Sequence, residues 1–484
     1  MSDTSLDPAD WDAFRALVHR AVDDAVDFLA TIRERPAWRP VPAAVRDALR
    51  EPLPRSGEPL EASYARFREL ILPYATGNLH PRFFGWVHGG GTPAGALAEF
   101  LAGVMNANVG GREHAAVYVE RAVVAWFGEL FGFPPAASGL LTTGTSMGNL
   151  LAICAARDAA LGAQARERGL AGAPLVAYAA RGAHSSIAKA LRIAGLGTAS
   201  LRAVAVDERF AIDLAALRAS IAADRAAGAR PFLVVATAGT VDTGAFDPLE
   251  ALADLCAAEG LWLHVDGAFG ALAILSPRHA HLVAGIARAD SLAFDAHKWL
   301  QAPYAVGCVL FRDERAHRAA FAESADYLVP ADRGTAAGAP WYAEYGLELS
   351  RDFRALRLWL TLRHYGIGRF GEAIARCCEL AAALGAQVAA ADDLELLAPV
   401  SLNVVCFRVR RPGLDEAALD RLNAAVAVAV QESGEAVPST TRVGGRLALR
   451  VCLINHRTVA EDLEVLLAAV RTAAGLPRLA EEAG

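Results

Sequence analysis

One stretch decides the fold: Leu261-Trp-Leu-His-Val-Asp-Gly-Ala-Phe-Gly270. A mostly apolar run ends in the acid Asp266, and small residues follow at once. In an open sheet of parallel strands, the ligand crevice lies outside the carboxyl ends of the strands. We therefore expect Asp266 at that crevice, with Gly267 and Ala268 leaving room for a flat ligand. An Asp that only caps the following turn is the alternative.

Similar apolar runs alternate with helical patterns on both sides of this stretch. We predict strands at 175–179, 203–206, 232–236, 261–265, 291–294 and 306–311. We predict helices at 117–130, 146–157, 186–194, 214–227 and 249–259. Apolar strands separated by helices indicate an α/β fold with a mainly parallel sheet that is covered on both faces.

The regions that flank this centre differ from it. Residues 1–76 predict short amphipathic helices, interrupted by prolines at 36–40 and 51–54, that cannot bury their apolar faces alone. After residue 365 a helix, a strand at 402–408, a helix at 415–431, a strand at 446–452 and a last helix from Val459 form a small α/β unit. The sequence thus predicts three parts: an N-terminal helical segment (1–76), a large domain (77–365) and a small C-terminal α/β domain (366–484).

Composition excludes several classes of function. The 484 residues include 47 Lys and Arg against 54 Asp and Glu, a net charge of −7, so no basic surplus suggests a nucleic-acid partner. We find no export signal and no apolar run of about 18 residues, so we expect a cytoplasmic protein without a membrane span. The seven cysteines are scattered, which favours buried thiols over disulfides or a metal site.

A second polar cluster follows the predicted strand at 291–294, in Ser291-Leu-Ala-Phe-Asp-Ala-His-Lys-Trp299. Lys298 lies between His297 and Trp299, an unusual place for a charge that only aids solubility. An amine near apolar groups and a second cation is a usable nucleophile for a carbonyl group. Lys298 is therefore a candidate for a covalent bond with an aldehyde.

Two further segments complete the set. Leu141-Thr-Thr-Gly-Thr-Ser-Met-Gly-Asn149 opens into an apolar helix, and its small and hydroxyl residues at a helix N-terminus suit a phosphate group. No Walker lysine follows, and no G-x-G-x-x-G follows a strand, so ATP and dinucleotides are poorly supported. In Ala183-His-Ser-Ser186, His184 would face the same crevice, although a lone His in this place is more often structural.

Together these groups describe one ligand, pyridoxal 5′-phosphate (PLP). Lys298 would bind its aldehyde, Asp266 would keep its ring nitrogen protonated, and His184 could stack on its ring. The phosphate would be held by three successive residues, Gly144, Thr145 and Ser146.

With these motifs the chain resembles the group II PLP-dependent amino-acid decarboxylases, which include the aromatic-amino-acid, histidine and glutamate enzymes. The resemblance runs from residue 80 to the last lobe and is carried by His80-Pro-Arg-Phe-Phe84, Ala183-His-Ser-Ser186, Ala236-Thr-Ala-Gly-Thr240, His264-Val-Asp-Gly-Ala268 and Asp295-Ala-His-Lys-Trp299. It implies the type I fold of PLP enzymes, whose large domain has a mainly parallel seven-stranded sheet. It also implies a homodimer with active sites at the interface, across which the N-terminal helices pack.

Carried over by position, the resemblance makes Lys298 the covalent cofactor lysine, Asp266 the partner of the ring nitrogen and His184 the stacking residue. The cofactor contacts that it implies are Gly144, Thr145, Ser146, Thr240, Ala268, Asp295 and His297. Three departures stand out. The family usually has Asn-Pro where this chain has Asp295-Ala296, and Thr where it has Val241. The usual bulky pocket residues are absent from 88–93, His-Gly-Gly-Gly-Thr-Pro.

The activity that the resemblance implies is removal of CO₂ from an L-amino acid, followed by protonation of Cα. In the aromatic enzymes a tyrosine on a mobile loop supplies that proton. Residues 323–346 predict a long loop, and counting back from Ser350-Arg-Asp-Phe-Arg354 places Tyr342 at that position. A small gap would exchange it for Tyr345, and either could be an ordinary loop aromatic.

The expected substrate contacts are Trp86, His88, Ser350 and Arg450. Arg450 could clamp a carboxylate with its guanidinium or form a structural ion pair. The aromatic residues Phe83, Phe84 and Trp86 favour an aromatic substrate, but the sequence does not select its side chain.

Three alternatives stay open. A misplaced loop tyrosine would let oxygen react at Cα, which describes an oxidative aldehyde synthase. An arginine that holds the α-carboxylate too tightly would favour an aminotransferase. A PLP-binding regulator without turnover is opposed by the retained lysine, acid and histidine, and by the lack of a basic recognition helix.

Overall fold

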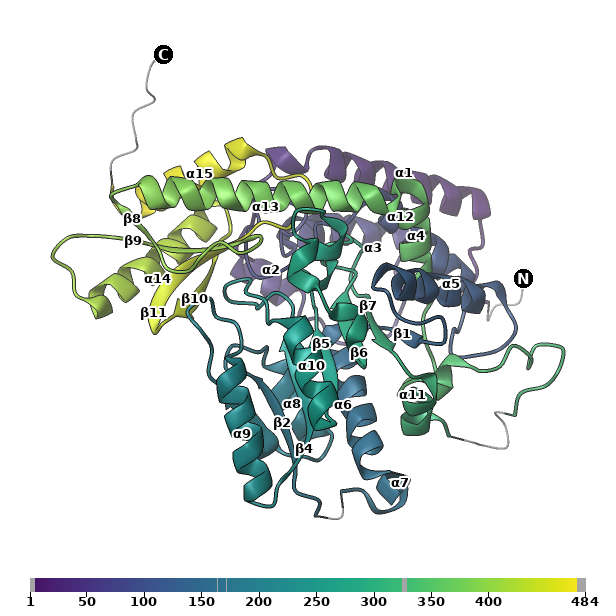
Figure 1. The fold of residues 1–484 in the computed structure, drawn as a ribbon. Helices are drawn as coiled ribbons and strands as arrows, with labels where there is room; N and C mark the ends of the chain where they lie inside the picture. Colours follow the sequence, from purple (N-terminus) through teal and green to yellow (C-terminus); the bar gives the residue numbers. More distant parts are fainter. Residues whose placement is uncertain (1–4, 163, 171, 324–328, 477–484) are drawn as a thin grey trace.

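The computed structural model describes residues 5–162, 164–170, 172–323 and 329–476. In Figure 1 a large α/β domain with one sheet adjoins a smaller C-terminal α/β domain, and the long helix α13 (Ile367–Ala390) runs along the top towards the smaller one. Residues 324–328 of the predicted loop lie outside the described residues.

The large domain is built on a seven-stranded sheet with the order β1-β7-β6-β5-β4-β2-β3. Its strands are β1 (Ser138–Thr142), β2 (Leu175–Ala180), β3 (Leu201–Val204), β4 (Arg230–Thr237), β5 (Trp262–Asp266), β6 (Ser291–Asp295) and β7 (Gly307–Phe311). From β3 to β6 all neighbours are parallel, and β7 is antiparallel to both β6 and β1. The predicted mainly parallel sheet is confirmed, with all six predicted strands present. The prediction missed β1, because its residues SGLLT mix apolar with turn-forming types.

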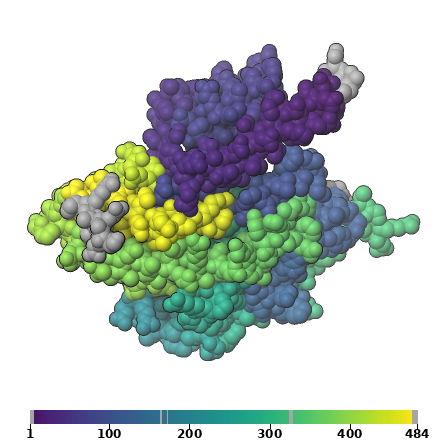
Figure 2. All heavy atoms as spheres, turned by 90° about the horizontal axis from the view of Figure 1, so that it is seen from above, coloured from purple at the N-terminus to yellow at the C-terminus, as the bar shows by residue number. Residues whose placement is uncertain are grey.

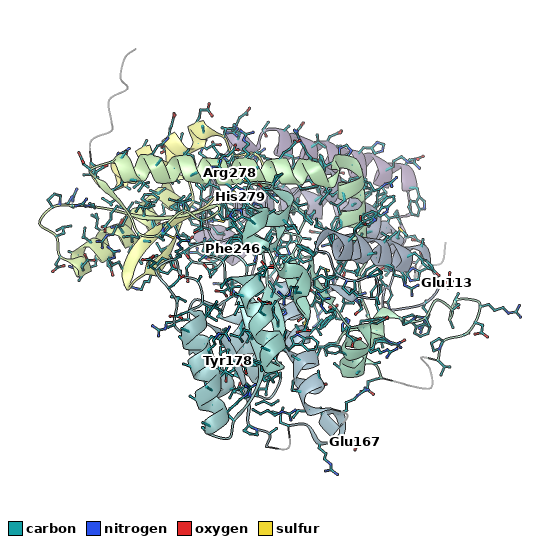
Figure 3. The ribbon with its side chains drawn as sticks, in the orientation of Figure 1. Glu113, Glu167, Tyr178, Phe246, Arg278 and His279 are labelled. Carbon is teal, nitrogen blue, oxygen red and sulfur yellow. The ribbon has the colours of Figure 1, made fainter. Side chains whose placement is uncertain are left out.

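Helices cover both faces of this sheet, as the alternation of buried side chains shows. Val176, Tyr178 and Val234 pack in a cluster with residues of α9 (Leu214–Ala226) and α10 (Leu249–Glu259). Tyr178, labelled in Figure 3, donates a hydrogen bond to Asp224 of α9. The intervening residues of β2 and β4 pack instead against α6 (Thr145–Leu161) and α8 (Ser186–Ile193). Burial on both faces explains why these strands read as unbroken apolar runs.

The other helices of the large domain are α4 (Pro93–Met105), α5 (Ala115–Leu130), α7 (Gln164–Arg168), α11 (Glu314–Phe321) and α12 (Arg354–Tyr365). Single helical turns lie at η4 (Thr198–Ser200), η5 (Gly270–Leu275), η6 (Ala280–Val283), η7 (Ile286–Arg288) and η9 (Tyr342–Glu344).

The C-terminal domain has an antiparallel sheet with the order β10-β11-β9-β8. Its elements after α13 are β8 (Leu394–Leu396), β9 (Val404–Val409), α14 (Glu416–Ser433), β10 (Ser439–Val443), β11 (Arg446–Cys452) and α15 (Ala460–Ala473). The predicted strand at 446–452 is confirmed, whereas the short, polar β8 and β10 were missed. Among the described residues, α13 is the one helix whose length and apolar composition would allow it to cross a membrane. Its buried residues pack with β8 and β9 in the domain core, which accounts for that composition.

The N-terminal segment is helical, as predicted, with α1 (Trp11–Ala30), α2 (Ala43–Ala48) and α3 (Leu60–Arg66). Short turns η1 (Ile32–Glu34), η2 (Phe67–Ile71) and η3 (Leu72–Tyr74) connect and extend these helices. Seen from above in Figure 2, the N-terminal residues, in purple, stand out from the rest of the molecule. Leu17 is the buried residue of α1, so the apolar face of this long helix is largely uncovered.

Candidate active site

A cavity of about 450 Å³ lies at the carboxyl ends of β4, β5 and β6, where a parallel sheet places its ligand. It brings together residues from β5, β6, the start of α6 and the loop at 86–88. Of the predicted site residues, its lining includes Trp86, His88, Gly144, Thr145, Ser146, His184, Asp266, Ala268, Asp295, His297 and Lys298.

Asp266 ends β5 and is 3% exposed. Its carboxylate accepts hydrogen bonds from Asn149 Nδ2 at 3.0 Å and from the backbone N–H of Ala268 at 3.2 Å. Burial raises the pKa of this carboxyl, while the hydrogen bond from the Asn149 amide and the neighbouring His184 and Lys298 oppose the rise. A buried carboxylate held by two donors is suited to pair with a protonated ring nitrogen.

Lys298 lies beside a second buried carboxylate. Its Nζ is 2.9 Å from Asp295 Oδ2, and the other oxygen of Asp295 accepts the backbone N–H of Thr145 at 2.6 Å. Burial acts to raise the pKa of Asp295, but Lys298 and His297 outweigh it and lower this pKa below its usual value. Asp295 is thus ionised and links the lysine to the first turn of α6.

The phosphate site is predicted at the start of α6. Thr145 opens the helix, and its hydroxyl Oγ1 is buried without a hydrogen-bond partner. The hydroxyl of Thr237, at the end of β4, is buried and unpartnered in the same cavity. Gly307 must be a glycine, because a Cβ would lie 2.8 Å from the backbone of Gly144. Free hydroxyls and the positive end of a helix fit an anion.

His184 lies at the cavity edge, with its ring held by Ser186. Its Nδ1 accepts hydrogen bonds from the Ser186 hydroxyl at 2.8 Å and from the Ser186 backbone N–H at 3.2 Å. With two donors aimed at Nδ1, the proton of a neutral ring is on Nε2.

Aromatic rings form the mouth of the cavity. Trp86 is 53% exposed and stacks on His88 with 5.8 Å between ring centroids, and Tyr304 contacts the rings of both His88 and His297. Burial, Lys298 and His297 all lower the pKa of His88, which is therefore neutral. The glycines after His88 permit this approach, because a Cβ on Gly89 would lie 2.2 Å from the carbonyl oxygen of His297.

Four predicted contacts lie outside this lining. Thr240 is buried and bonds to Thr243, Ser350 is exposed, and Tyr342 and Tyr345 face a different cavity beside α5 and β1. Tyr342 packs under the guanidinium of Arg351 at 4.9 Å, and burial raises its pKa well above the usual value. In the single chain these residues do not reach the site, and their roles stay predictions.

Arg450 is likewise outside the lining, although it touches the pocket wall. It donates hydrogen bonds to the backbone carbonyls of Val241, at 2.6 Å, and Trp86, at 2.8 Å. These bonds to carbonyl groups do not form an ion pair, whereas the Nη2 atom of Arg450 is buried without a hydrogen-bond partner. As a substrate contact Arg450 stays a prediction.

Sequence reasoning gave no role to Asn149, Ser186, Thr237 or Tyr304, all of which lie in or against the cavity. Asn149 stands within a quoted motif, but only its position opposite β5 shows what it contacts. Tyr304 carries no pattern that could have singled it out.

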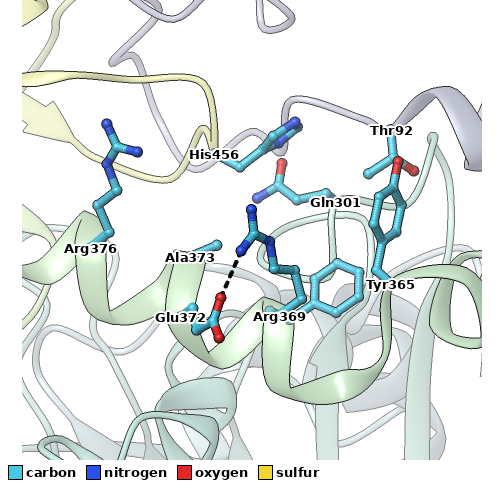
Figure 4. A pocket seen from close by; sticks show the side chains of 9 residues that line it. Thr92, Gln301, Tyr365, Arg369, Glu372, Ala373, Arg376 and His456 are labelled. Carbon is cyan, nitrogen blue, oxygen red and sulfur yellow. Dashed lines mark hydrogen bonds and ion pairs between the residues drawn. The ribbon is translucent and has the colours of Figure 1, made fainter.

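A second cavity of about 420 Å³ lies behind Gln301. Figure 4 shows its guanidinium groups, one of which, from Arg369, pairs with Glu372. Its lining in the described residues includes no lysine and no residue of β5 or β6. The first cavity is therefore the candidate active site.

Comparison with known proteins agrees with this geometry. The model of the pyridoxal-dependent decarboxylase conserved domain matches residues 42–410. The chain belongs to this family. It is 33% identical to the aromatic-L-amino-acid decarboxylase of Bacillus atrophaeus over 95% of both chains, and 30% identical to the phenylacetaldehyde synthase of Petunia hybrida over 92% of this chain and 90% of that one. The structure of Oryza sativa TDC with PLP and tryptamine superposes with a TM-score of 0.89 at 27% identity, covering 97% of this chain and 99% of that one.

Family membership implies PLP, and the residues present fit it. The cofactor needs an amine for its aldehyde, a carboxylate for its ring nitrogen and an anion site for its phosphate. Lys298, Asp266 and the start of α6 provide these groups in one cavity. The unpartnered Thr145 and Thr237 hydroxyls are buried donors that a polar ligand would satisfy. The chain is thus a PLP-dependent decarboxylase of the type I fold.

Proposed function

We propose that this enzyme decarboxylates an aromatic L-amino acid in the cavity around Lys298 and releases the corresponding amine. The observation that carries the proposal is the meeting of Lys298, Asp266 and the N-terminus of α6 in one cavity with an aromatic mouth. The Bacillus relative is named for aromatic amino acids, and the rice structure was solved with tryptamine, which supports the same substrate class.

Bound PLP supplies an electron-accepting ring that stabilises the charge left at Cα when CO₂ departs. The side chains of the cavity would hold and orient the cofactor. Asp266, fixed by Asn149 and by the N–H of Ala268, would offer a negative charge to the protonated ring nitrogen. Lys298 anchors the cofactor through its amine. His184, with its proton on Nε2, presents a flat ring at the cavity edge.

The mouth of the cavity explains the choice of an aromatic substrate. Trp86, His88 and Tyr304 present flat rings at the mouth. Because the pKa of His88 is lowered, these three residues offer uncharged rings to the side chain of the substrate. Flat apolar rings pack well against an aromatic side chain and offer no partner to a carboxylate. We therefore expect tryptophan, tyrosine or phenylalanine to be preferred over glutamate.

The test is to incubate the PLP-loaded protein with each of the twenty amino acids and to follow CO₂ release. Aromatic amino acids should give CO₂ and an equal amount of amine. Lys298→Ala should lose both the absorption band of bound PLP and CO₂ release. Release of CO₂ from glutamate or aspartate but not from aromatic amino acids would refute the substrate class.

A second candidate function is an oxidative aldehyde synthase. It is favoured by the position of Tyr342 outside the cavity of the single chain, and one of the relatives is a phenylacetaldehyde synthase. Without a proton donor at Cα, oxygen could react there and give aldehyde, ammonia and peroxide. Measuring amine against aldehyde and peroxide from the same reaction separates the two functions. An aminotransferase stays an alternative, because the Nη2 atom of Arg450 is buried without a hydrogen-bond partner while its other nitrogens donate to backbone carbonyls.

We also propose a homodimer with the active site near the interface. Apolar side chains are exposed along α1, at Val22 and Val26, and along α4, at Leu97, Phe100 and Val104. Exposed apolar surface of this extent is typical of a protein–protein contact. Sedimentation should give twice the chain mass, and Phe100→Asp should shift the protein towards monomer. A monomeric wild-type protein would refute the dimer.

The division into parts at 76 and 365 and the cytoplasmic location are also proposals. Gly366 separates α12 from α13, and all seven cysteines are free thiols, which suits a reducing compartment. Limited proteolysis should cut near these boundaries, and cell fractionation should recover the enzyme with cytoplasmic proteins.

A further inference from the structure

A stripe of polar side chains lies on one face of β5. Trp262, His264 and Asp266 alternate with the apolar Leu263 and Val265, so all three point to the side of the sheet that α6 covers. In the sheet register His264 is paired with Ser291 of β6. These groups are almost fully buried: His264, Ser291 and Asn149 have no exposed surface.

The donors in this stripe can be assigned one by one. Trp262 Nε1–H can only donate, and it donates to Ser291 Oγ at 2.8 Å. Burial lowers the pKa of His264 to about 3, so its ring is neutral. His264 Nε2 is 2.9 Å from Asn149 Oδ1, which only accepts, so the ring proton is on Nε2. Nδ1 then accepts the hydroxyl of Ser291 at 2.9 Å.

At Asn149 the series of hydrogen bonds branches in two directions. Since its Oδ1 faces the N–H of His264, both amide hydrogens are free to point the other way. One goes to Asp266 Oδ2 at 3.0 Å and the other to Ser186 Oγ at 3.1 Å. Ser186 then donates its hydroxyl to His184 Nδ1 at 2.8 Å. One amide therefore holds both the carboxylate and the histidine of the site.

We propose that Asn149 is a positioning residue that joins Asp266 and His184 into one hydrogen-bonded unit, with the direction of its amide fixed by His264. This inference rests on the proposed function of the site and deepens it. Its consequence is that the hydrogen bond from Asn149 favours the ionised form of Asp266, because burial alone favours the neutral acid.

The decisive variant is Asn149→Asp, which has nearly the same size but no N–H and adds a second carboxylate beside Asp266. Two carboxylates at this distance share a proton, so the cofactor ring loses its fully charged partner. We expect the ¹⁵N resonance of the ring nitrogen, in protein loaded with ¹⁵N-labelled PLP, to move from the protonated towards the unprotonated position. We also expect kcat to fall about 10–100-fold, as when groups that orient metal ligands are removed, with a smaller change in KM.

Control variants separate this role from a general loss of structure. Asn423→Asp changes another fully buried asparagine, which bonds to the backbone of Val409 in the C-terminal domain. It should leave the ¹⁵N resonance unchanged. At His264, Gln keeps an N–H donor for Asn149 while Phe does not, so His264→Phe should move the resonance and His264→Gln should largely preserve it.

An unchanged ¹⁵N resonance in both Asn149→Asp and His264→Phe would overturn the inference. So would an equal shift in Asn423→Asp. This readout needs only bound PLP, so it stands even if the substrate proves not to be aromatic. Loss of the proposed function would instead appear as a wild-type protein that binds PLP with a protonated ring but releases no CO₂.

Discussion

Asp295→Asn should make the cofactor bind more tightly. In the protein without cofactor, the Lys298 ammonium and the Asp295 carboxylate form a mostly buried ion pair at 2.9 Å, with side chains 18% and 6% exposed. In the role that we propose for it, Lys298 leaves this pair to bond with the aldehyde of PLP. The wild-type protein therefore loses the pair when it binds cofactor, whereas the Asn variant has no such pair to lose.

The magnitude follows from the geometry. Removing one partner of a buried ion pair typically costs about 3–5 kcal/mol. The lower end applies here, because Lys298 is partly exposed and can be hydrated. The variant without cofactor should thus be about 3 kcal/mol less stable, and its Kd for PLP should fall by about 100-fold, since each 1.4 kcal/mol is a factor of ten. An asparagine can still accept the N–H of Thr145, so the first turn of α6 should stay in place.

Titration of the cofactor-free protein with PLP, followed by absorbance, gives the Kd, and urea unfolding of the same protein gives the stability. Asp290→Asn is the matched control: it makes the same change at the other end of β6, where the carboxylate accepts the N–H of Leu263. A Kd for Asp295→Asn that is unchanged or higher than that of the wild type would show that the ion pair does not oppose loading.

Three further outcomes are expected. Arg351→Met should lower the free energy of unfolding by about 3–5 kcal/mol, because it leaves the fully buried carboxyl of Glu120 without its partner; the double variant with Glu120→Leu should recover much of this loss in urea unfolding. Burial, helped by Arg82, lowers the pKa of His80 to about 4; the unfolded chain therefore binds the proton first, and stability should be full above about pH 6.5 and decrease by about 3 kcal/mol as the pH falls to 4. His80→Gln should flatten that decrease in thermal unfolding scans. Trp86→Ala should raise KM for aromatic amino acids about 10-fold with little change in kcat, as expected for the loss of one ring contact at the mouth, and an unaffected KM would remove Trp86 from the substrate site.

Much of the site could be predicted from local sequence, because each part is a strand end or a helix start. Asp266 is the last residue of β5, Lys298 follows β6, and Thr145 opens α6. In a parallel sheet all strand ends of one polarity lie at the same edge, so local patterns alone predict that these groups meet. The same logic failed for β1, β8 and β10, whose mixed composition does not distinguish a strand from a turn.

What the tertiary structure alone decided is which polar groups face one another. The sequence contains Asn149, Ser186 and His264 in separate motifs, yet nothing local says that one amide bonds to Asp266 and Ser186 at once. Nor does it say that Arg450 bonds to carbonyl groups, or that Tyr342 packs under Arg351. Strand and helix periods are set by near neighbours along the chain, so the sequence determined the fold class and the cofactor. A hydrogen bond depends on distance and direction between groups far apart in sequence, and only the packing of α6 on β5 fixes these.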